Sequence, residues 1–241
     1  MQILHTSHIG GFMEKKGKFI VLEGGEGSGK STCIGVLKER LPLIFGAHAF
    51  LFTREPGGTA IGENIRRILM SKDPGLEHMQ PLTELMLFCA ARTEHVQTVI
   101  NPALQNGTHI VCDRFDASTI AYQIDALERN DLRSDFEILN ALALGHRSRK
   151  VFHQWMGGPH PDIYIILDVD PWVGLERTAE AKGKDTTRFD DKEIAFHVRV
   201  RESFLRFAQI HPESAVVLNA NMAQEDVVQE VLDIILSVVD S

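Results

Sequence analysis

The stretch Gly24-Gly25-Glu26-Gly27-Ser28-Gly29-Lys30-Ser31 follows an apolar run at residues 19–22 and Glu23, and it decides the fold of this 241-residue chain. It matches the pattern G-x-x-x-x-G-K-[S/T] at a point where a strand turns through glycines into a helix. In such a phosphate-binding loop (P-loop), backbone N–H groups surround phosphate oxygens and the helix N-terminus adds partial positive charge. The pattern predicts a nucleotide-phosphate site formed by Gly24, Gly25, Glu26, Gly27, Ser28, Gly29, Lys30, Ser31 and Thr32.

Two side chains of this loop have predicted roles in handling the triphosphate. Lys30 is long enough to reach the β- and γ-phosphates, and the Ser31 hydroxyl suits a Mg²⁺ ion that bridges them. The chemistry of a P-loop alone leaves ATPases, GTPases, kinases and transport motors open. The chain contains no N-K-x-D segment, which weakens the guanine-specific GTPase alternative.

The length and composition of the chain restrict its class. A chain of 241 residues suits one α/β domain, which we place at 18–241 behind a disordered leader at 1–17. The leader lacks the charged-then-apolar pattern of a secretion signal. The chain has no run of eighteen apolar residues, so no membrane partner is predicted. The net charge of −8 argues against a nucleic-acid partner. Cys33, Cys89 and Cys112 are widely spaced, which indicates buried reduced thiols in a cytoplasmic protein.

Apolar strand-like runs alternate with helical patterns along the whole chain, which is typical of a parallel sheet with crossover helices. The fold class predicted is therefore α/β, with a P-loop NTPase-like parallel five-stranded sheet, flanking helices and a mobile lid. The strands are predicted at 18–23, 49–53, 108–112, 163–168 and 215–218. The helices are predicted at 31–41, 61–70, 82–104, 118–126, 134–144, 171–181, 192–210 and 224–239.

The third predicted strand ends in Asp113-Arg114. Ligands of open α/β sheets bind at the carboxyl ends of the strands, so both side chains are candidates for the site. Asp113 would hold Mg²⁺ or its water, and Arg114 would grip a second phosphate with its planar guanidinium. The alternative is that Asp113 only caps the next helix, a task that Ser118 would perform equally well.

Three further segments carry a resemblance to a known family. Phe52-Thr53-Arg54-Glu55-Pro56-Gly57-Gly58-Thr59 follows the second strand, Phe88-Cys89-Ala90-Ala91-Arg92 lies on a long helix, and Asp113-Arg114-Phe115-Asp116-Ala117-Ser118-Thr119-Ile120-Ala121-Tyr122-Gln123 follows the third strand. With the P-loop, these segments resemble bacterial thymidylate kinase, a P-loop nucleoside monophosphate kinase, in order and spacing. The resemblance runs from about residue 18 to the C-terminus.

The resemblance implies how the thymine base of the acceptor, dTMP, is bound. Phe88 would stack on the thymine ring, and Arg92, one helical turn later, would donate to a carbonyl at the edge of the base. Such a donor rejects cytosine, whose amino group would leave the arginine unpaired. The alternative for Phe88 is an ordinary place in the core.

The resemblance also implies roles around the sugar and the phosphates. Arg54 and Arg114 would hold the acceptor phosphate, and Glu26 would contact the sugar 3′-hydroxyl. Tyr122 would lie beneath the deoxyribose, unless it is only a packed helix residue. Glu55 has the simpler alternative of bracing its turn. The dTMP-binding residues implied are Arg54, Phe88, Arg92, Arg114, Ser118, Tyr122 and Gln123.

Phosphoryl transfer also needs a cation near the transferring group. Gly27 occupies the P-loop place where some family members carry a basic residue, so the chain resembles the lid-arginine type. The lid is predicted at 181–191, with Arg188 as the first choice, Lys182 and Lys184 as alternatives and Arg177 next. The family's lid usually holds more arginines. Residues 146–160 look like an insertion.

The activity implied is Mg²⁺-dependent transfer of the ATP γ-phosphoryl group to dTMP, which yields dTDP and ADP. Lys30, Arg188, Glu26 and Asp113 are the candidate catalytic residues, and Ser31 and Asp113 are the candidate metal ligands. The resemblance also implies a homodimer. The alternatives are another nucleoside monophosphate kinase, a deoxynucleoside kinase, or a P-loop ATPase that switches a partner protein.

Overall fold

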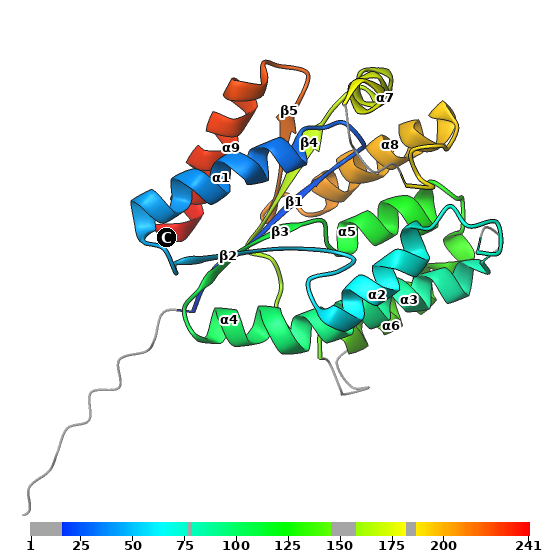
Figure 1. The fold of residues 1–241 in the computed structure, drawn as a ribbon, viewed down its shortest axis with the longest axis horizontal. Helices are drawn as coiled ribbons and strands as arrows, with labels where there is room; N and C mark the ends of the chain where they lie inside the picture. Colours follow the sequence, from blue (N-terminus) through cyan, green and yellow to red (C-terminus); the bar gives the residue numbers. More distant parts are fainter. Residues whose placement is uncertain (1–15, 77–78, 146–157, 182–186) are drawn as a thin grey trace, which may run out of the picture.

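A five-stranded parallel sheet forms the centre of the computed structural model, which describes residues 16–76, 79–145, 158–181 and 187–241. The strands are β1 (Phe19–Gly24), β2 (Phe50–Arg54), β3 (His109–Asp113), β4 (Ile163–Asp168) and β5 (Ala215–Asn219). Their spatial order is β2-β3-β1-β4-β5 (Figure 1). The predicted fold class is thereby confirmed, since all five predicted strands form and every pairing is parallel.

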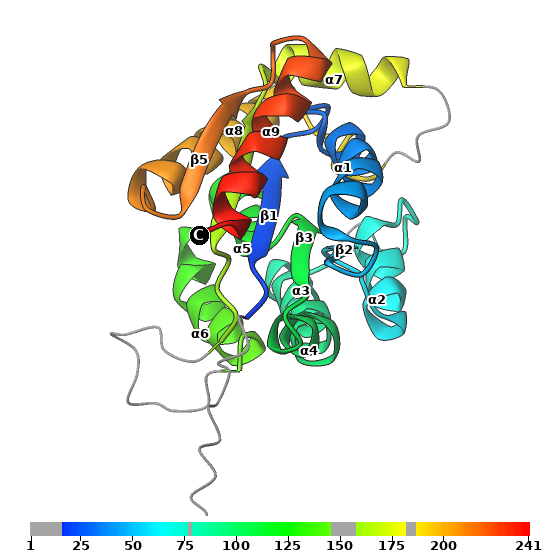
Figure 2. The same ribbon diagram turned by 90° about the vertical axis from the view of Figure 1, so that its left-hand side faces the viewer.

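Helices cover both faces of this sheet, in the three-layer arrangement that buries both sides of parallel strands. One face is covered by α1 (Lys30–Phe45) and α9 (Gln224–Val239), which lie side by side (Figure 2). The other elements are α2 (Ala60–Met70), α3 (Pro81–His95), α4 (Asn101–Gln105), α5 (Asp116–Thr119), α6 (Arg133–Ala143), α7 (Pro171–Glu180) and α8 (Ile194–Ile210).

The core has one large cluster of buried side chains on each face of the sheet. Alternate residues of β1 point to opposite sides, so Ile20 and Leu22 pack toward α1 and α9. Phe19 and Val21 pack toward α3, α5 and α8 on the other face. All three cysteines are buried and free, as predicted. Within the described residues, no helix combines the length and apolar character that a membrane crossing requires.

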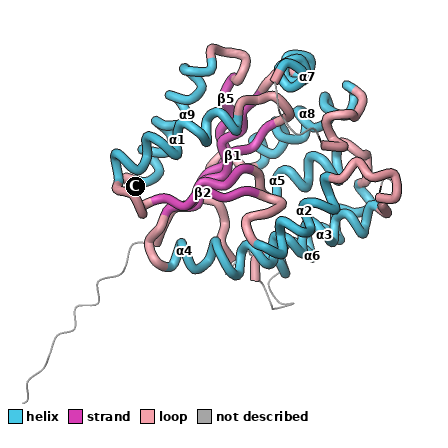
Figure 3. The backbone as a smooth tube through the Cα atoms, in the orientation of Figure 1, coloured by secondary structure: helices cyan, strands magenta, loops and turns pink. Residues whose placement is uncertain are grey.

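Two helices differ from their prediction because each contains a π-helical segment. Figure 3 shows the helices in cyan around the central strands in magenta. The helix predicted at 82–104 is α3, then a π-helical segment at Val96–Ile100, then α4. Pro102 has no N–H and its ring crowds the carbonyl four residues earlier, so a local change of register precedes it. The helix predicted at 118–126 is α5 followed by a π-helical segment at Ile120–Asp125, which holds Tyr122 and Gln123.

Three predicted segments fall partly or largely outside the described residues. Of the leader at 1–17, Lys16 and Gly17 are described, and Gly17 donates its backbone N–H to the Leu104 carbonyl at 2.9 Å. Of the insertion at 146–160, residues 158–160 are described, and Pro159 is buried. Of the lid at 181–191, residues 182–186 lie outside, and these include Lys182 and Lys184.

Candidate active site

The P-loop lies where β1 ends and α1 begins. Gly24, Gly27 and Gly29 adopt positive φ angles of 143°, 65° and 91°, which L-residues with side chains rarely adopt. At Gly27 a Cβ atom would lie only 1.9 Å from the backbone oxygen of Gly174 on α7. A basic side chain is therefore sterically excluded at Gly27, and positive charge near the phosphates must come from other residues.

Lys30 is folded back onto this loop and is 7% exposed. Its ammonium group donates to the carbonyl oxygens of Gly24 and Gly25 at 2.9 and 3.0 Å and to the Ser28 hydroxyl at 3.1 Å. Burial is the main cause that lowers the pKa of Lys30 to about 8, and the neighbouring Arg114 cation lowers it further. A bound phosphate would place negative charge next to this buried ammonium group and would favour its protonated form.

One cavity of about 500 Å³ connects the P-loop with α3 and the segment after β3. Most of the predicted site residues line it. They are Glu26, Gly27, Ser28, Gly29, Lys30, Ser31 and Thr32 from the P-loop, and Phe88, Arg92, Asp113, Arg114, Ser118, Tyr122 and Gln123 from the acceptor side. The fold thus places a predicted donor site and a predicted acceptor site in one continuous space.

Arg114 connects the two sides of this cavity. Its guanidinium donates to the Gly24 carbonyl at 2.9 Å and forms a 2.9 Å ion pair with Glu26. The same group lies 4.9 Å from the centre of the Tyr122 ring, whose hydroxyl donates to Glu26 at 3.0 Å. Glu26, Arg114 and Tyr122 therefore form one charged cluster, although they are distant in sequence.

A buried carboxylate that no sequence motif marks lies next to this cluster. Glu23, fully buried at the end of β1, accepts the backbone N–H groups of Phe115 and Ser118 at 2.8 and 3.1 Å. The Ser118 hydroxyl donates to its second oxygen at 2.6 Å. Burial raises the pKa of Glu23 to about 7, although Arg114 and these hydrogen bonds act in the opposite direction. Glu23 holds the segment after β3 against the P-loop.

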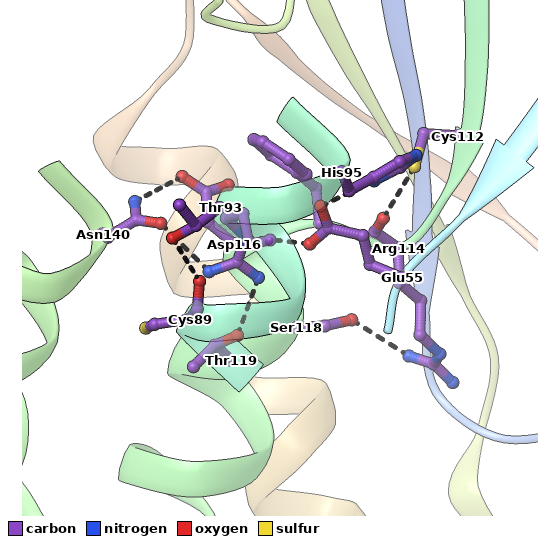
Figure 4. A network of polar contacts seen from close by, with 12 residues as sticks. Glu55, Cys89, Thr93, His95, Cys112, Arg114, Asp116, Ser118, Thr119 and Asn140 are labelled. Atoms are coloured by element: carbon purple, nitrogen blue, oxygen red, sulfur yellow. Dashed lines mark hydrogen bonds and ion pairs between the residues drawn. The ribbon is translucent and has the colours of Figure 1, made fainter. Parts of the chain in front are cut away.

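The acceptor side is organised around Arg92, which is 1% exposed. Its Nε donates to Glu55 at 2.8 Å, its Nη1 to Asn140 at 3.0 Å and its Nη2 to Thr119 at 3.0 Å. Asn140 in turn donates to Asp116 (Figure 4). Phe88, one turn earlier on α3, lines the same cavity and is 9% exposed. The spacing of four residues places both side chains on one helical face, as the sequence predicted.

Arg54 and Arg188 lie outside the cavity lining formed by the described residues. Arg54 is half-exposed and pairs with Glu63 at 2.9 Å. Arg188 pairs with buried Glu84 at 2.8 Å and donates from Nε to the Leu69 carbonyl at 2.7 Å. Both contacts hold the guanidinium of Arg188 against α2 and α3 in this arrangement. Its role at the transferring phosphoryl group stays a prediction.

Several residues that line the cavity carried no signal strong enough to be chosen. Thr119 lies inside the segment 113–123 that carries the family resemblance, while Arg66 on α2 belongs to no recognisable pattern. Arg66 donates to the Pro56 carbonyl at 3.1 Å. Phe189 and Gln224 also line the cavity without having been predicted, whereas Arg177 had been named as a candidate cation. Only the three-dimensional fold brings these residues together.

The residues present also fit a magnesium ion that is held mainly by phosphate oxygens. Asp113 Oδ1 is buried and has no hydrogen-bond partner among the described residues. Ser31 lines the same cavity at the N-terminus of α1. The described part of the chain contains no cluster of three or more His, Cys, Asp or Glu residues that would enclose a metal by itself. Mg²⁺ bound with nucleotide typically takes one or two protein ligands and completes its shell with phosphates and water.

A P-loop at the end of the central strand, joined to a second polar pocket by one cavity, defines a P-loop nucleotide-binding protein with room for a second substrate. A model of the family described as Thymidylate kinase matches residues 22–231. The thymidylate kinase of Chlamydia caviae is 38% identical over 216 residues, which are 89% of this chain and 95% of that protein. The thymidylate kinase of Magnetococcus marinus is 39% identical over 209 residues, which are 86% and 89% of the two chains.

A solved structure agrees with these relatives. The crystal structure of thymidylate kinase from Ehrlichia chaffeensis matches with a TM-score of 0.68 and 30% identity, and the match covers 92% of this chain and 99% of that one. The chain therefore belongs to the thymidylate kinase family.

Proposed function

We propose that this protein transfers the γ-phosphoryl group of ATP to dTMP and releases dTDP and ADP. The observation that carries this proposal is the single cavity of about 500 Å³ that joins the P-loop to Phe88 and Arg92. Phosphoryl transfer needs donor and acceptor aligned in one enclosed space more than it needs a protein nucleophile. The names of the relatives support the choice of acceptor.

On the donor side, the backbone N–H groups of the P-loop surround the ATP phosphates. Lys30 exchanges its contacts with the Gly24 and Gly25 carbonyls for phosphate oxygens. Ser31 and Asp113 hold Mg²⁺, which, when bound, neutralises charge on the phosphate oxygens. The unpaired Oδ1 of Asp113 supports this assignment. The acceptor phosphate oxygen attacks in line, so no covalent enzyme intermediate is formed.

On the acceptor side, Phe88 stacks on thymine and Arg92 donates to a carbonyl of its edge. Tyr122 and Glu26 lie at the sugar, and Ser118 and Gln123 complete the acceptor pocket. Arg114 binds the acceptor phosphate, since its guanidinium already contacts Glu26 and the Gly24 carbonyl of the P-loop. Arg66 lines the cavity where Arg54 does not, and it is the better placed of the two for a second phosphate contact.

The cation that meets the transferring group comes from Arg177 or from the lysines at 182 and 184. Arg177 lines the cavity from α7 and donates to the Ala220 carbonyl at 2.9 Å. A single carbonyl contact is more easily exchanged for phosphate than the buried ion pair of Arg188. The lid at 181–191 would close over the phosphates to exclude water.

The proposal extends to a homodimer in the cytoplasm. Exposed apolar side chains on neighbouring helices α2, α3 and α6 support a second copy as the partner of this surface; they are Ile61, Ile68, Leu82, Met86, Ile138 and Leu142. Light scattering of the wild type and of Met86→Lys tests this point, with a shift toward the monomer expected for the variant. Three buried free cysteines suit a reducing compartment.

The dependence of ADP release on an added acceptor tests the proposed reaction. A kinase releases ADP in proportion to dTMP and forms dTDP, which chromatography detects. The main alternative, an ATPase that switches a partner protein, would release ADP and inorganic phosphate without any acceptor. Release of ADP that is independent of every monophosphate would contradict the proposal.

A further inference from the structure

We propose that His95 is a positioning residue for base selection, which acts by fixing Glu55 and, through it, the guanidinium of Arg92. The inference rests on the proposed function, because it assigns Arg92 to the base of the acceptor. His95 itself is absent from the cavity lining formed by the described residues. Any effect of His95 on the acceptor must therefore pass through its neighbours.

The geometry forms a continuous chain of polar contacts from β2 to the cavity. His95 is fully buried at the end of α3, where its Nε2 lies 2.6 Å from the Thr53 hydroxyl. Its Nδ1 lies 3.0 Å from Glu55 Oε1 (Figure 4). The other oxygen of Glu55 accepts from Arg92 Nε at 2.8 Å. Each polar atom in this series of contacts therefore has a defined partner.

A carboxylate held at one oxygen only can turn about its terminal torsion, since the energy wells of that torsion are broad. His95 occupies the second oxygen of Glu55 and thereby fixes the plane of the carboxylate. Glu55, Asn140 and Thr119 together engage three of the five N–H groups of Arg92. Two N–H groups remain, and their direction is set by these contacts.

The direction of those two N–H groups determines which base is accepted. A fixed donor pairs with the carbonyl of thymine but meets the amino group of cytosine as donor against donor. A guanidinium that can shift by a fraction of an ångström relaxes this distinction, because hydrogen bonds weaken steeply with poor angles. His95 therefore contributes to the ratio of the two activities and not only to stability.

Two substitutions distinguish the roles of the two ring nitrogens of His95. The amide of His95→Asn reaches about the position of Nδ1 and can still donate to Glu55, whereas the amide of His95→Gln reaches about the position of Nε2. A larger residue is unsuitable because Gly58 packs against this ring. Thr53→Val is the matched control, since it removes the partner of Nε2 and leaves the Glu55 contact in place.

The measurement is the ratio of kcat/KM for dTMP to kcat/KM for dCMP in each full-length protein. We expect His95→Gln to lower this ratio about tenfold, roughly the value of one hydrogen bond to a charged group. The fall should arise mainly from a higher KM for dTMP. His95→Asn and Thr53→Val should keep the ratio within about threefold of the wild type. A ratio in His95→Gln equal to that of the wild type overturns the inference, as does an equal loss in His95→Asn.

A measurement on the unmodified protein covers the case in which the variants fail to fold. Nitrogen NMR of the His95 ring should show a proton on Nδ1, the atom that faces Glu55. An unprotonated Nδ1 would overturn the inference, because that atom would then be unable to donate a hydrogen bond to the carboxylate. Failure of the proposed function is distinguishable, since a wild type that does not prefer dTMP contradicts it before any variant is made.

Discussion

The two ends of the cavity are built in different ways. The phosphate-binding end consists of consecutive residues, 24–32, whose shape comes from glycines and from the start of α1. The acceptor end is a buried network in which Arg92 contacts partners that lie 27 to 48 residues away in sequence. We infer that a substitution in the loop costs mainly turnover, whereas a substitution in the network costs mainly stability.

Lys30→Ala should produce the largest effect on activity. The transferring charge loses a fixed cation, so kcat should fall by roughly a thousandfold or more, comparable to the loss of an arginine finger. The free energy of unfolding should not decrease, because burial disfavours the ammonium group of Lys30 in the folded protein and lowers its pKa. Steady-state kinetics and urea unfolding measure the two quantities.

Lys38→Ala on the exposed side of α1 is the control for this variant, and it should leave both quantities unchanged. Near-normal turnover in a folded Lys30→Ala protein would remove the P-loop from the mechanism.

Arg92→Ala should show the opposite behaviour. It leaves the Glu55 carboxylate, which is nearly inaccessible, with a buried charge that has lost its arginine partner, and such losses cost about 3–5 kcal/mol of stability. Arg54→Ala breaks a half-exposed pair with Glu63 and should cost less than about 1 kcal/mol. Urea unfolding of both variants makes the comparison. Equal losses would show that the buried network contributes no more than a surface pair.

Much of the phosphate-binding end was predictable from sequence because its determinants are local. Gly24, Gly27 and Gly29 adopt positive φ angles, which favour glycine. The strand before them is recognisable as a run of apolar residues. The five strands were predicted for the same reason. Pro102 was visible too, but the register change before it depends on packing that a helical pattern does not encode.

The acceptor end was predictable only in part. Phe88 and Arg92 follow from helical spacing, whereas the partners of Arg92 come from β2, α5 and α6 and share no pattern with it. Arg188 shows the limit most clearly. Its charge suggested a phosphate partner, but the fold brings it to Glu84, a pairing between residues about a hundred positions apart.

The pH dependence of the free energy of unfolding tests the role of Glu23, which connects the phosphate-binding end of the cavity with the acceptor end. Its pKa is raised from 4.5 to about 7 in the folded protein, so the folded state holds a proton that the unfolded state loses. The stability contributed by this group is therefore greatest at low pH and falls as pH rises from about 5 to 7, by about 2 kcal/mol. Urea unfolding at both pH values should show the fall in the wild type but not in Glu23→Gln.

The carboxylates with lowered pKa values, Glu63 and Asp131, titrate below this window. Burial lowers the pKa of His197, which acts in the opposite direction within the window, but His197 is present in both proteins, so the difference between them reports Glu23. An identical slope in the wild type and in Glu23→Gln would rule out Glu23 as its source.

Arg188→Ala should give the smallest of these effects. Arg188 pairs with Glu84, and the other oxygen of Glu84 accepts from Gln123 of the acceptor pocket at 3.1 Å. We expect KM for dTMP to rise about tenfold with little change in kcat, the value of roughly one charge-assisted hydrogen bond. Arg199→Ala is the matched control, since it removes a contact from α8 to the Ala126 carbonyl. A fall in kcat of a hundredfold or more at constant KM would instead favour a direct role at the phosphates.

The most direct test of the account is the rate of ADP release with ATP, Mg²⁺ and each of the common nucleoside monophosphates and nucleosides in turn. If the loop and the network form the donor and acceptor sites of one reaction, dTMP should give the highest kcat/KM and dUMP a lower one. dCMP should fail, because cytosine places an amino group where thymine places the carbonyl that meets Arg92, and the thymidylate assignment requires the purine monophosphates to fail as well. A highest kcat/KM for dCMP, for a purine monophosphate or for an unphosphorylated nucleoside would contradict the account.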